Sequence, residues 1–242
     1  MDDRLNFEVV LEYQSSGTSG AQEDCFVFNQ NKSVFALADG FGGAPTGEKA
    51  AQTSVKAINE FISQEARDPD ATFPFVLRSY YSLAANVLFN AVLYANRKLL
   101  SDNGVKSLNE RGGASAVTGF CDGDLLALAS VGAVQAYLSR NGLARPLTTP
   151  RTYERLHDWV QISEAAHSAI PLTALGIASD LEPEIVEVRL KAGDHLWLAS
   201  GGLGDGFWLR PWVGAGDTAG AKSALNAINF ALNTSVFALR VC

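Results

Sequence analysis

The residues best suited to chemistry lie at positions 36–49, ALADGFGGAPTGEK, where a single aspartate enters a glycine-rich turn. Asp39 follows the apolar run 33–38, which predicts a buried strand, and the glycines after it let the backbone approach a ligand closely. Beyond the turn, apolar residues recur at helical spacing: Ala51, Val55, Ile58 and Ile62. A carboxylate at a strand end, beside a turn that opens a helix, suits a cation or a phosphate group.

The elements that must position Asp39 are mainly short strands. Runs rich in aromatic and β-branched residues predict strands at 7–14, 24–29, 33–38, 114–120, 124–131, 134–140, 185–190, 194–199 and 234–240. Asp122-Gly123 and Asn141-Gly142 are typical of hairpin turns.

Two long helices are expected, at 47–63 and 80–96. Polar residues return every three or four positions along the second segment, at Ser79, Ser82, Asn86 and Asn90, which indicates an amphipathic core helix and not a membrane span. Loops are expected at 64–74 and 207–219. Trp208 and Trp212 in the second loop allow either buried packing or an exposed contact surface.

The sequence around Asp39 resembles the ADGxGG…GE signature of the metal-dependent protein phosphatases, the PPM or type 2C family. Further family-like motifs lie upstream at 22–25 and downstream at 130–138, 161–165, 172–176 and 194–205, in the family's order. The resemblance implies an α+β fold: a four-layer α-β-β-α sandwich in which two antiparallel sheets are flanked by helices. It also implies a single domain over 1–242 and serine/threonine phosphatase chemistry of the bacterial type.

Such phosphatases use two divalent cations, Mg²⁺ or Mn²⁺, to activate a hydroxide and to neutralise the phosphoryl oxygens. By resemblance, Asp39 would bridge the two metals and the Gly40 carbonyl would bind one of them. Glu23 and Asp24 would bind directly or through water.

Four positions depart from the family pattern. The resemblance places metal-binding aspartates at Gly201 and Leu232, an aspartate linked to a third cation at Ala133, and a phosphate-gripping arginine at Ser19. Three carboxylates then remain to balance two divalent ions, so we expect at most one weakly bound ion. A shifted alignment in which Asp205 supplies a missing carboxylate is the alternative.

Three functions remain open. The first is a pseudophosphatase that acts as a binding or regulatory module for a phosphoprotein or kinase partner. The second is an active or impaired Mg²⁺- or Mn²⁺-dependent serine/threonine phosphatase. The third is a structural subunit of an assembly.

Composition excludes some partners. The 242 residues carry a net charge of −7 and no basic run longer than two residues, which argues against nucleic acid. The N-terminus shows no apolar signal segment, and no membrane association is expected. Three cysteines without metal-ligand spacing favour a reducing compartment, so the cytoplasm is predicted.

Overall fold

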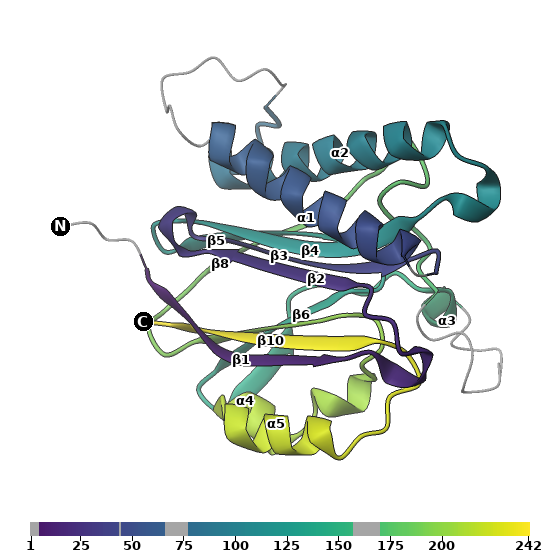
Figure 1. Cartoon of the computed structure of the whole chain (residues 1–242). Coiled ribbons are helices and arrows are strands. Elements are labelled where there is room, and N and C mark those ends of the chain that lie inside the picture. Colours follow the sequence, from purple (N-terminus) through teal and green to yellow (C-terminus); the bar gives the residue numbers. More distant parts are fainter. Residues whose placement is uncertain (1–4, 44, 66–76, 157–169) are drawn as a thin grey trace.

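Two antiparallel five-stranded sheets pack face to face in the computed structural model, which describes residues 5–43, 45–65, 77–156 and 170–242 (Figure 1). The first, here called the β10 sheet, has the order β1 (Phe7–Ser15), β10 (Thr234–Val241), β9 (His195–Ala199), β6 (Gln135–Arg140) and β7 (Leu143–Pro146). The second, here called the β3 sheet, has the order β2 (Asp24–Asn29), β3 (Val34–Phe41), β4 (Gly113–Asp122), β5 (Leu125–Val131) and β8 (Glu184–Arg189).

Helices cover the outer faces of both sheets. The pair α1 (Thr46–Glu65) and α2 (Leu83–Gly104) packs on the β3 sheet, and α4 (Pro211–Ala215) and α5 (Thr218–Asn226) lie on the β10 sheet (Figure 1). Shorter helical turns lie in the connections: α3 (Tyr153–Leu156), η1 (Gly17–Ser19), η2 (Gln30–Lys32), η3 (Leu108–Glu110) and η4 (Asp205–Phe207). The order helix, sheet, sheet, helix confirms the predicted four-layer α+β sandwich.

Strand β3 shows why the central strands read as continuous apolar runs. Ala36 and Ala38 belong to the apolar cluster under α1 and α2, whereas Phe35 and Leu37 belong to the cluster between the two sheets. Side chains alternate between the faces of a strand, so a strand buried on both faces needs apolar residues at every position. Small alanines on the helix side let the helices approach, and larger side chains fill the space between the sheets.

The polar residues of α2 satisfy buried backbone groups. Ser82 caps the helix by accepting a hydrogen bond of 3.1 Å from the Ala85 amide. Asn86, which is buried, donates to the carbonyls of Arg78, Tyr81 and Ser82. Helix α2 therefore begins three residues after the predicted start and continues to Gly104. No helix in the described residues is long and apolar enough to cross a membrane.

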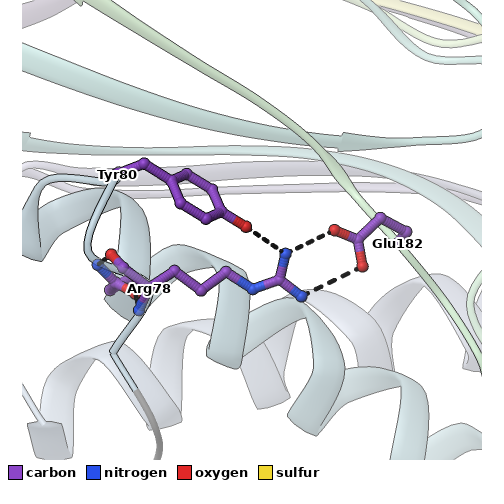
Figure 2. A network of polar contacts seen from close by, with 4 residues as sticks. Arg78, Tyr80 and Glu182 are labelled. Atoms are coloured by element: carbon purple, nitrogen blue, oxygen red, sulfur yellow. Dashed lines mark hydrogen bonds and ion pairs between the residues drawn. The ribbon is translucent and has the colours of Figure 1, made fainter.

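An ion pair fastens the segment before α2 to the segment before β8. Figure 2 shows the Arg78 guanidinium donating to Glu182 Oε1 at 2.8 Å, to Glu182 Oε2 at 3.3 Å and to the Tyr80 hydroxyl at 2.9 Å. The same guanidinium lies 4.0 Å from the ring centre of Phe89. These contacts are largely exposed, so they fix the path of the chain more than they stabilise it.

Three sequence-based expectations need correction or extension. The segment 207–219 is not a loop, because it contains the end of η4, all of α4 and the start of α5. Pro211 occupies the first turn of α4, and the Asp217 side chain caps α5 by accepting from the Gly220 amide at 2.9 Å. Strand β7 was not expected; it pairs with β6 across the predicted Asn141-Gly142 turn. Most of the other expected loop, 64–74, lies outside the described residues.

The two tryptophans of the 207–219 segment pack inward. Trp208 is buried, its ring stacks on that of Tyr137 with centroids 4.2 Å apart, and its indole N–H donates to the Gln135 side chain. Trp212 is partly buried against the same cluster. For Trp208, the buried alternative is confirmed.

Strands β1 and β10 bring the two ends of the described chain together. Phe7 pairs with Val241, and the Cys242 amide donates to the Asn6 carbonyl at 2.9 Å. The other end of this strand pair, where Ser15 faces Thr234, lies near the functional residues described next.

Candidate functional site

Asp24 and Asp39 lie side by side at one end of the β3 sheet. Asp24 is the first residue of β2, and it is paired in register with Asp39 on β3. The neighbouring Gly40 amide donates to the Glu23 carbonyl at 3.0 Å, so Asp24 and Asp39 form a pair of the non-hydrogen-bonded kind, in which opposed side chains approach most closely. The sheet register therefore brings two carboxyl groups together.

Burial and mutual repulsion disfavour the charged forms of this pair. Burial raises the pKa of Asp39 well above its usual range, and the nearby charges of Asp24 and Glu23 add to the rise. Burial likewise raises the pKa of Asp24, while hydrogen bonds from Ser235, Ser200 and Asn233 act in the opposite direction. The pair therefore retains a proton to a higher pH than an isolated carboxyl group, unless a cation compensates the charge.

Two backbone segments reach this pair from the β10 sheet. The Gly201 amide donates to Asp39 Oδ2 at 2.8 Å, and the Asn233 side-chain amide donates to Asp24 Oδ1 at 3.1 Å. Gly201 and Leu232 are the positions at which the resemblance placed aspartates. The chain thus presents N–H donors to the carboxyl pair from these two segments, where the family pattern presents further acids.

Glu23 is the third acid of the site. Burial, and then the charge of Asp24, raises the pKa of Glu23. A Cβ atom on Gly47 would lie 2.3 Å from Glu23 Oε1, and one on Gly40 would lie 2.0 Å from the Gly47 carbonyl oxygen. Glycine is therefore required at position 40, where the obstacle is backbone, whereas a side chain at position 47 would displace the Glu23 carboxyl group.

The remaining predicted residues lie on the surrounding turns. Ser19 ends η1, whose Thr18 hydroxyl donates to the Ala231 carbonyl at 3.0 Å, beside Leu232. Ala133 is buried in the turn between β5 and β6, and its amide donates at 3.1 Å to the hydroxyl of Ser115, the residue opposite Asp39 on β4. Asp205 opens η4 in the connection that follows Gly201. The flap-like motif at 161–165 lies outside the described residues.

A pocket of about 460 Å³ opens beside Asp39. Its polar lining comes from Glu23, Asp39, Ser115 and Asn233, together with the backbone of Gly40 and Gly202. Its apolar lining comes from Phe41, Ile170, Pro171, Leu172, Ala174, Ile177 and Leu232. No Lys, Arg or His is among these lining residues, so within the described chain the pocket has an acidic floor and apolar walls.

The donors fit a hard cation in kind. Glu23 Oε1 and Asp24 Oδ2 are buried and have no hydrogen-bond partner, and such carboxylate oxygens are ligands that Mg²⁺ and Mn²⁺ accept. Within the ranges that the structure describes, however, no three His, Cys, Asp or Glu side chains are grouped closely enough to hold a metal ion. The fit is therefore partial and rests on the acids of the β2–β3 end.

Sequence reasoning missed the hydrogen-bond donors around the acids. Ser200 accepts from the Ser235 amide at 2.9 Å, and the Ser235 hydroxyl accepts from the Gln22 side chain at 3.1 Å. Both hydroxyls lower the pKa of Asp24. The Ser200-Gly201 and Asn233-Thr234-Ser235 sequences could have indicated such donors. Ile170 and Ile177, which line the pocket, carry no comparable signal.

The four-layer architecture and the paired acids at the end of one sheet are typical of the metal-dependent phosphatases. A family model described as Protein phosphatase 2C matches residues 18–227, which is most of the chain. The chain therefore belongs to the protein phosphatase 2C family. No curated protein matches it significantly in sequence.

Solved bacterial phosphatases share this fold at low sequence identity. The Mycobacterium tuberculosis serine/threonine phosphatase PstP/Ppp is 21% identical, with a TM-score of 0.74 over 98% of this chain and 99% of that one. The S. agalactiae serine/threonine phosphatase is 19% identical, with a TM-score of 0.74 over 98% of this chain and 100% of that one. The PstP catalytic domain, solved in complex with two manganese ions, is 21% identical, with a TM-score of 0.72 over 98% and 99%. These likenesses establish the fold.

Proposed function

We propose that this chain is a pseudophosphatase or a severely impaired phosphatase, which acts as a binding or regulatory module for a phosphoprotein or kinase partner. The observation that carries the proposal is the 2.8 Å hydrogen bond from the Gly201 amide to Asp39 Oδ2. An N–H group there brings a hydrogen-bond donor, and no negative charge, to the carboxyl group that would bridge two cations.

Charge decides against two cations. Two divalent ions bring four positive charges, whereas the site offers Glu23, Asp24 and Asp39. Leu232 adds an apolar side chain to the pocket and no carboxylate. At most one weakly bound Mg²⁺ or Mn²⁺ is therefore expected, held by Asp39, Asp24, Glu23 and the Gly40 carbonyl.

A bound divalent cation would supply positive charge for a phosphoryl group and would lower the pKa of a coordinated water. The residues of this chain supply little else toward that reaction. Ser19 stands where the resemblance placed an arginine, and among the described residues no basic side chain lines the pocket. Within that part of the chain, a phosphate ester would meet acidic groups and no cationic side chain to hold it.

The test is calorimetric titration with manganese. One weak site is expected, which disappears in Asp39→Asn and persists in Asp205→Asn. Two tight sites would overturn the charge argument, and loss of binding in Asp205→Asn would favour the shifted alignment. The described chain contributes three unpaired cysteines, which support a reducing compartment such as the cytoplasm and call for reducing buffer in this experiment.

A second candidate is an active phosphatase that works with a rearranged site. The buried, unpartnered oxygens of Glu23 and Asp24 favour it, because they are free to bind a cation. Activity on p-nitrophenyl phosphate separates the two functions. Each electrostatic element of a two-metal site is worth several kcal/mol, so the impaired protein should be slower than an intact family member by orders of magnitude. Turnover near one per second would establish the second candidate.

A further inference from the structure

A second pocket, of about 610 Å³, lies on the helix-covered side of the β10 sheet. It opens between η4, the start of α4 and the end of α5, and we call it the Arg210 pocket. Among its described lining residues, Gly202 alone also lines the pocket beside Asp39. The Arg210 pocket is therefore a separate site, and its volume is typical of pockets that bind small molecules.

Aromatic side chains anchored in the core form the walls of the Arg210 pocket. Phe207 and Phe230 are each 7% exposed, and Trp212 packs against the same apolar cluster. The ring of Phe207 meets that of Trp208 edge to face, with centroids 5.3 Å apart, and the ring of Phe230 lies 6.1 Å from that of Tyr13. These walls are held in place without a ligand, so a ligand that enters does not have to order them.

Two glycines of the 202–206 segment leave the pocket open. A Cβ atom on Gly204 or Gly206 would meet no atom within 4 Å beyond its chain neighbours, and neither residue has a positive φ. Packing and backbone conformation therefore do not require glycine there. Both residues line the pocket, so their missing side chains leave room for a ligand.

Arg210 is the only charged residue among the described residues that line this pocket. Its guanidinium lies 5.9 Å from the ring centre of Trp212, and no acid among the described side chains is paired with it. The indole N–H of Trp212 is buried and also lacks a partner. The polar groups without partners at this site are therefore donors, which favours a ligand that brings an acceptor.

The end of α5 acts against an anion but is the weaker influence. A helix C-terminus carries roughly half a negative charge, and Ala224 and Ala227 of this end line the pocket. Its last carbonyls are already occupied, since that of Ala224 accepts from the Ala227 amide, and that of Leu225 accepts from the Ile228 amide and the Tyr13 hydroxyl. The guanidinium has a full charge and several unused N–H groups, so the net preference is for an anion.

We propose that the Arg210 pocket binds a small aromatic carboxylate. The aromatic body lies against Phe207, Trp212 and Phe230, and the carboxylate accepts two N–H groups from Arg210. One cation in the lining matches one negative charge, which favours a carboxylate over a doubly charged phosphate ester. The inference goes beyond the proposed function and does not depend on it, because none of these residues belongs to the acid site.

A matched pair of small molecules tests the inference. The probe is 2-naphthylacetate, and its control is 2-naphthylacetamide, which keeps the shape and removes the charge. A chelator is present, so the carboxylate cannot bind through a metal ion beside Asp39. In two-dimensional NMR titrations, we expect the carboxylate to bind at least about tenfold more tightly than the amide. It should shift the signals of Gly204, Gly206, Phe230 and the Trp212 indole N–H.

Matched variants separate the charge from the walls. Arg210→Gln should weaken 2-naphthylacetate at least about tenfold and leave the amide unchanged, whereas Arg145→Gln, at an exposed arginine of β7, should change neither. Ala227→Phe should fill the pocket and weaken both compounds. Ala219→Phe, at an exposed position of α5 that does not line the pocket, should weaken neither. Melting curves confirm that each variant is folded.

Several outcomes would overturn the inference. These are equal binding of the two compounds, tighter binding of 2-naphthyl phosphate or of decanoate, unchanged binding in Arg210→Gln, or no binding at about 10 mM. In a titration without chelator, saturating manganese should leave the affinity of 2-naphthylacetamide unchanged; competition would place the naphthyl group beside Asp39 and contradict the proposal. The assay uses neither turnover nor metal stoichiometry, so its failure leaves the pseudophosphatase proposal standing, and the reverse also holds.

Discussion

At the scale of single residues, the site is defined by which groups face Asp39 and Asp24. A carboxylate at position 201 or 232 would add charge to a cation site, whereas the Gly201 amide and the Asn233 side chain stabilise the acids without a cation. The sequence could identify the acids and the missing acids by resemblance. It could not identify a backbone N–H as a donor, because that depends on how the chain folds after β9 and not on a side chain.

The raised pKa of Asp39 makes stability depend on pH in a definite direction. The folded protein holds this proton more tightly than the unfolded chain, in which the pKa of the aspartate is near 3.8. The contribution of Asp39 to the free energy of unfolding is therefore fully present at low pH, and it is lost as the pH rises through the raised pKa. In the absence of divalent ions, we expect Asp39→Asn to melt at a higher temperature than the wild type at pH 8, by about 2–4 °C for each kcal/mol regained.

The difference between Asp39→Asn and the wild type should vanish below about pH 3, where the carboxyl group is protonated in both states. Asp124→Asn is the control, because Asp124 is exposed; its effect should stay within about 0.5 kcal/mol at every pH. A wild type that is more stable than Asp39→Asn at pH 8 would contradict the account of the carboxyl pair.

Restoring the missing acids tests the residue assignments in the opposite direction. The double change Gly201→Asp and Leu232→Asp should create a second manganese site opposite Asp39, because both positions lie beside the carboxyl pair. Phosphatase activity should rise in parallel, measured on p-nitrophenyl phosphate. Adding Ser19→Arg should mainly lower KM, since a phosphate-binding arginine contributes in the ground and transition states alike. A folded double variant that binds one manganese ion would show that positions 201 and 232 are misassigned.

At the scale of helices and strands, the sequence predicted the long, buried elements well and missed the short ones at the surface. Strands β3 and β5 were predicted within about three residues of their bounds because both faces are buried and the apolar signal is continuous. Strand β7 has four residues, lies at a sheet edge and ends in Pro146, so it gave no such signal. Helices α4 and α5 have five and nine residues and contain glycines, and their stability comes from packing on the β10 sheet, which local pattern does not reveal.

Helix α2 positions one wall of the pocket through a buried amide. Asn96 Nδ2 donates to the Ala178 carbonyl at 2.8 Å, and Asn96 Oδ1 accepts from the Gly176 amide at 2.8 Å, so the residue between them, Ile177, is held in place. Asn96→Ala would leave the buried Gly176 amide and the partly buried Ala178 carbonyl without these partners. We expect it to reduce the free energy of unfolding by about 2–4 kcal/mol in urea titrations.

Asn90→Ala on the same helix is the matched control. The Asn90 side chain donates only to the Asn86 carbonyl one turn earlier, and the residue is half-buried. Its loss should cost no more than about 0.5 kcal/mol. Equal effects of the two substitutions would mean that Asn96 has no special role in holding the pocket wall.

At the scale of the whole molecule, the resemblance gave the four layers correctly, although only the two helices of one outer layer could be located in advance.

The three cysteines differ in how far they are exposed to solvent. Cys121 is buried, which raises its pKa to about 12, Cys25 is partly buried with a raised pKa, and Cys242 is exposed. We expect a maleimide at pH 7 to label Cys242 first, as mass spectrometry of peptides would show, and labelling there should leave binding in the pocket unchanged.

The pairing of β1 with β10 places the pocket and the two ends of the described chain at opposite ends of one strand pair. Strand β10 runs eight residues from Thr234, near the pocket, to Val241, a length of roughly 25 Å. Anything attached at Asn6 or Cys242 is therefore held at the far end of the strand pair from the pocket. Donor and acceptor dyes at these two residues would lie close together whether or not a ligand is bound. Their energy transfer would report whether β1 and β10 remain paired, and a surface tethered through Cys242 would leave the pocket open to solution.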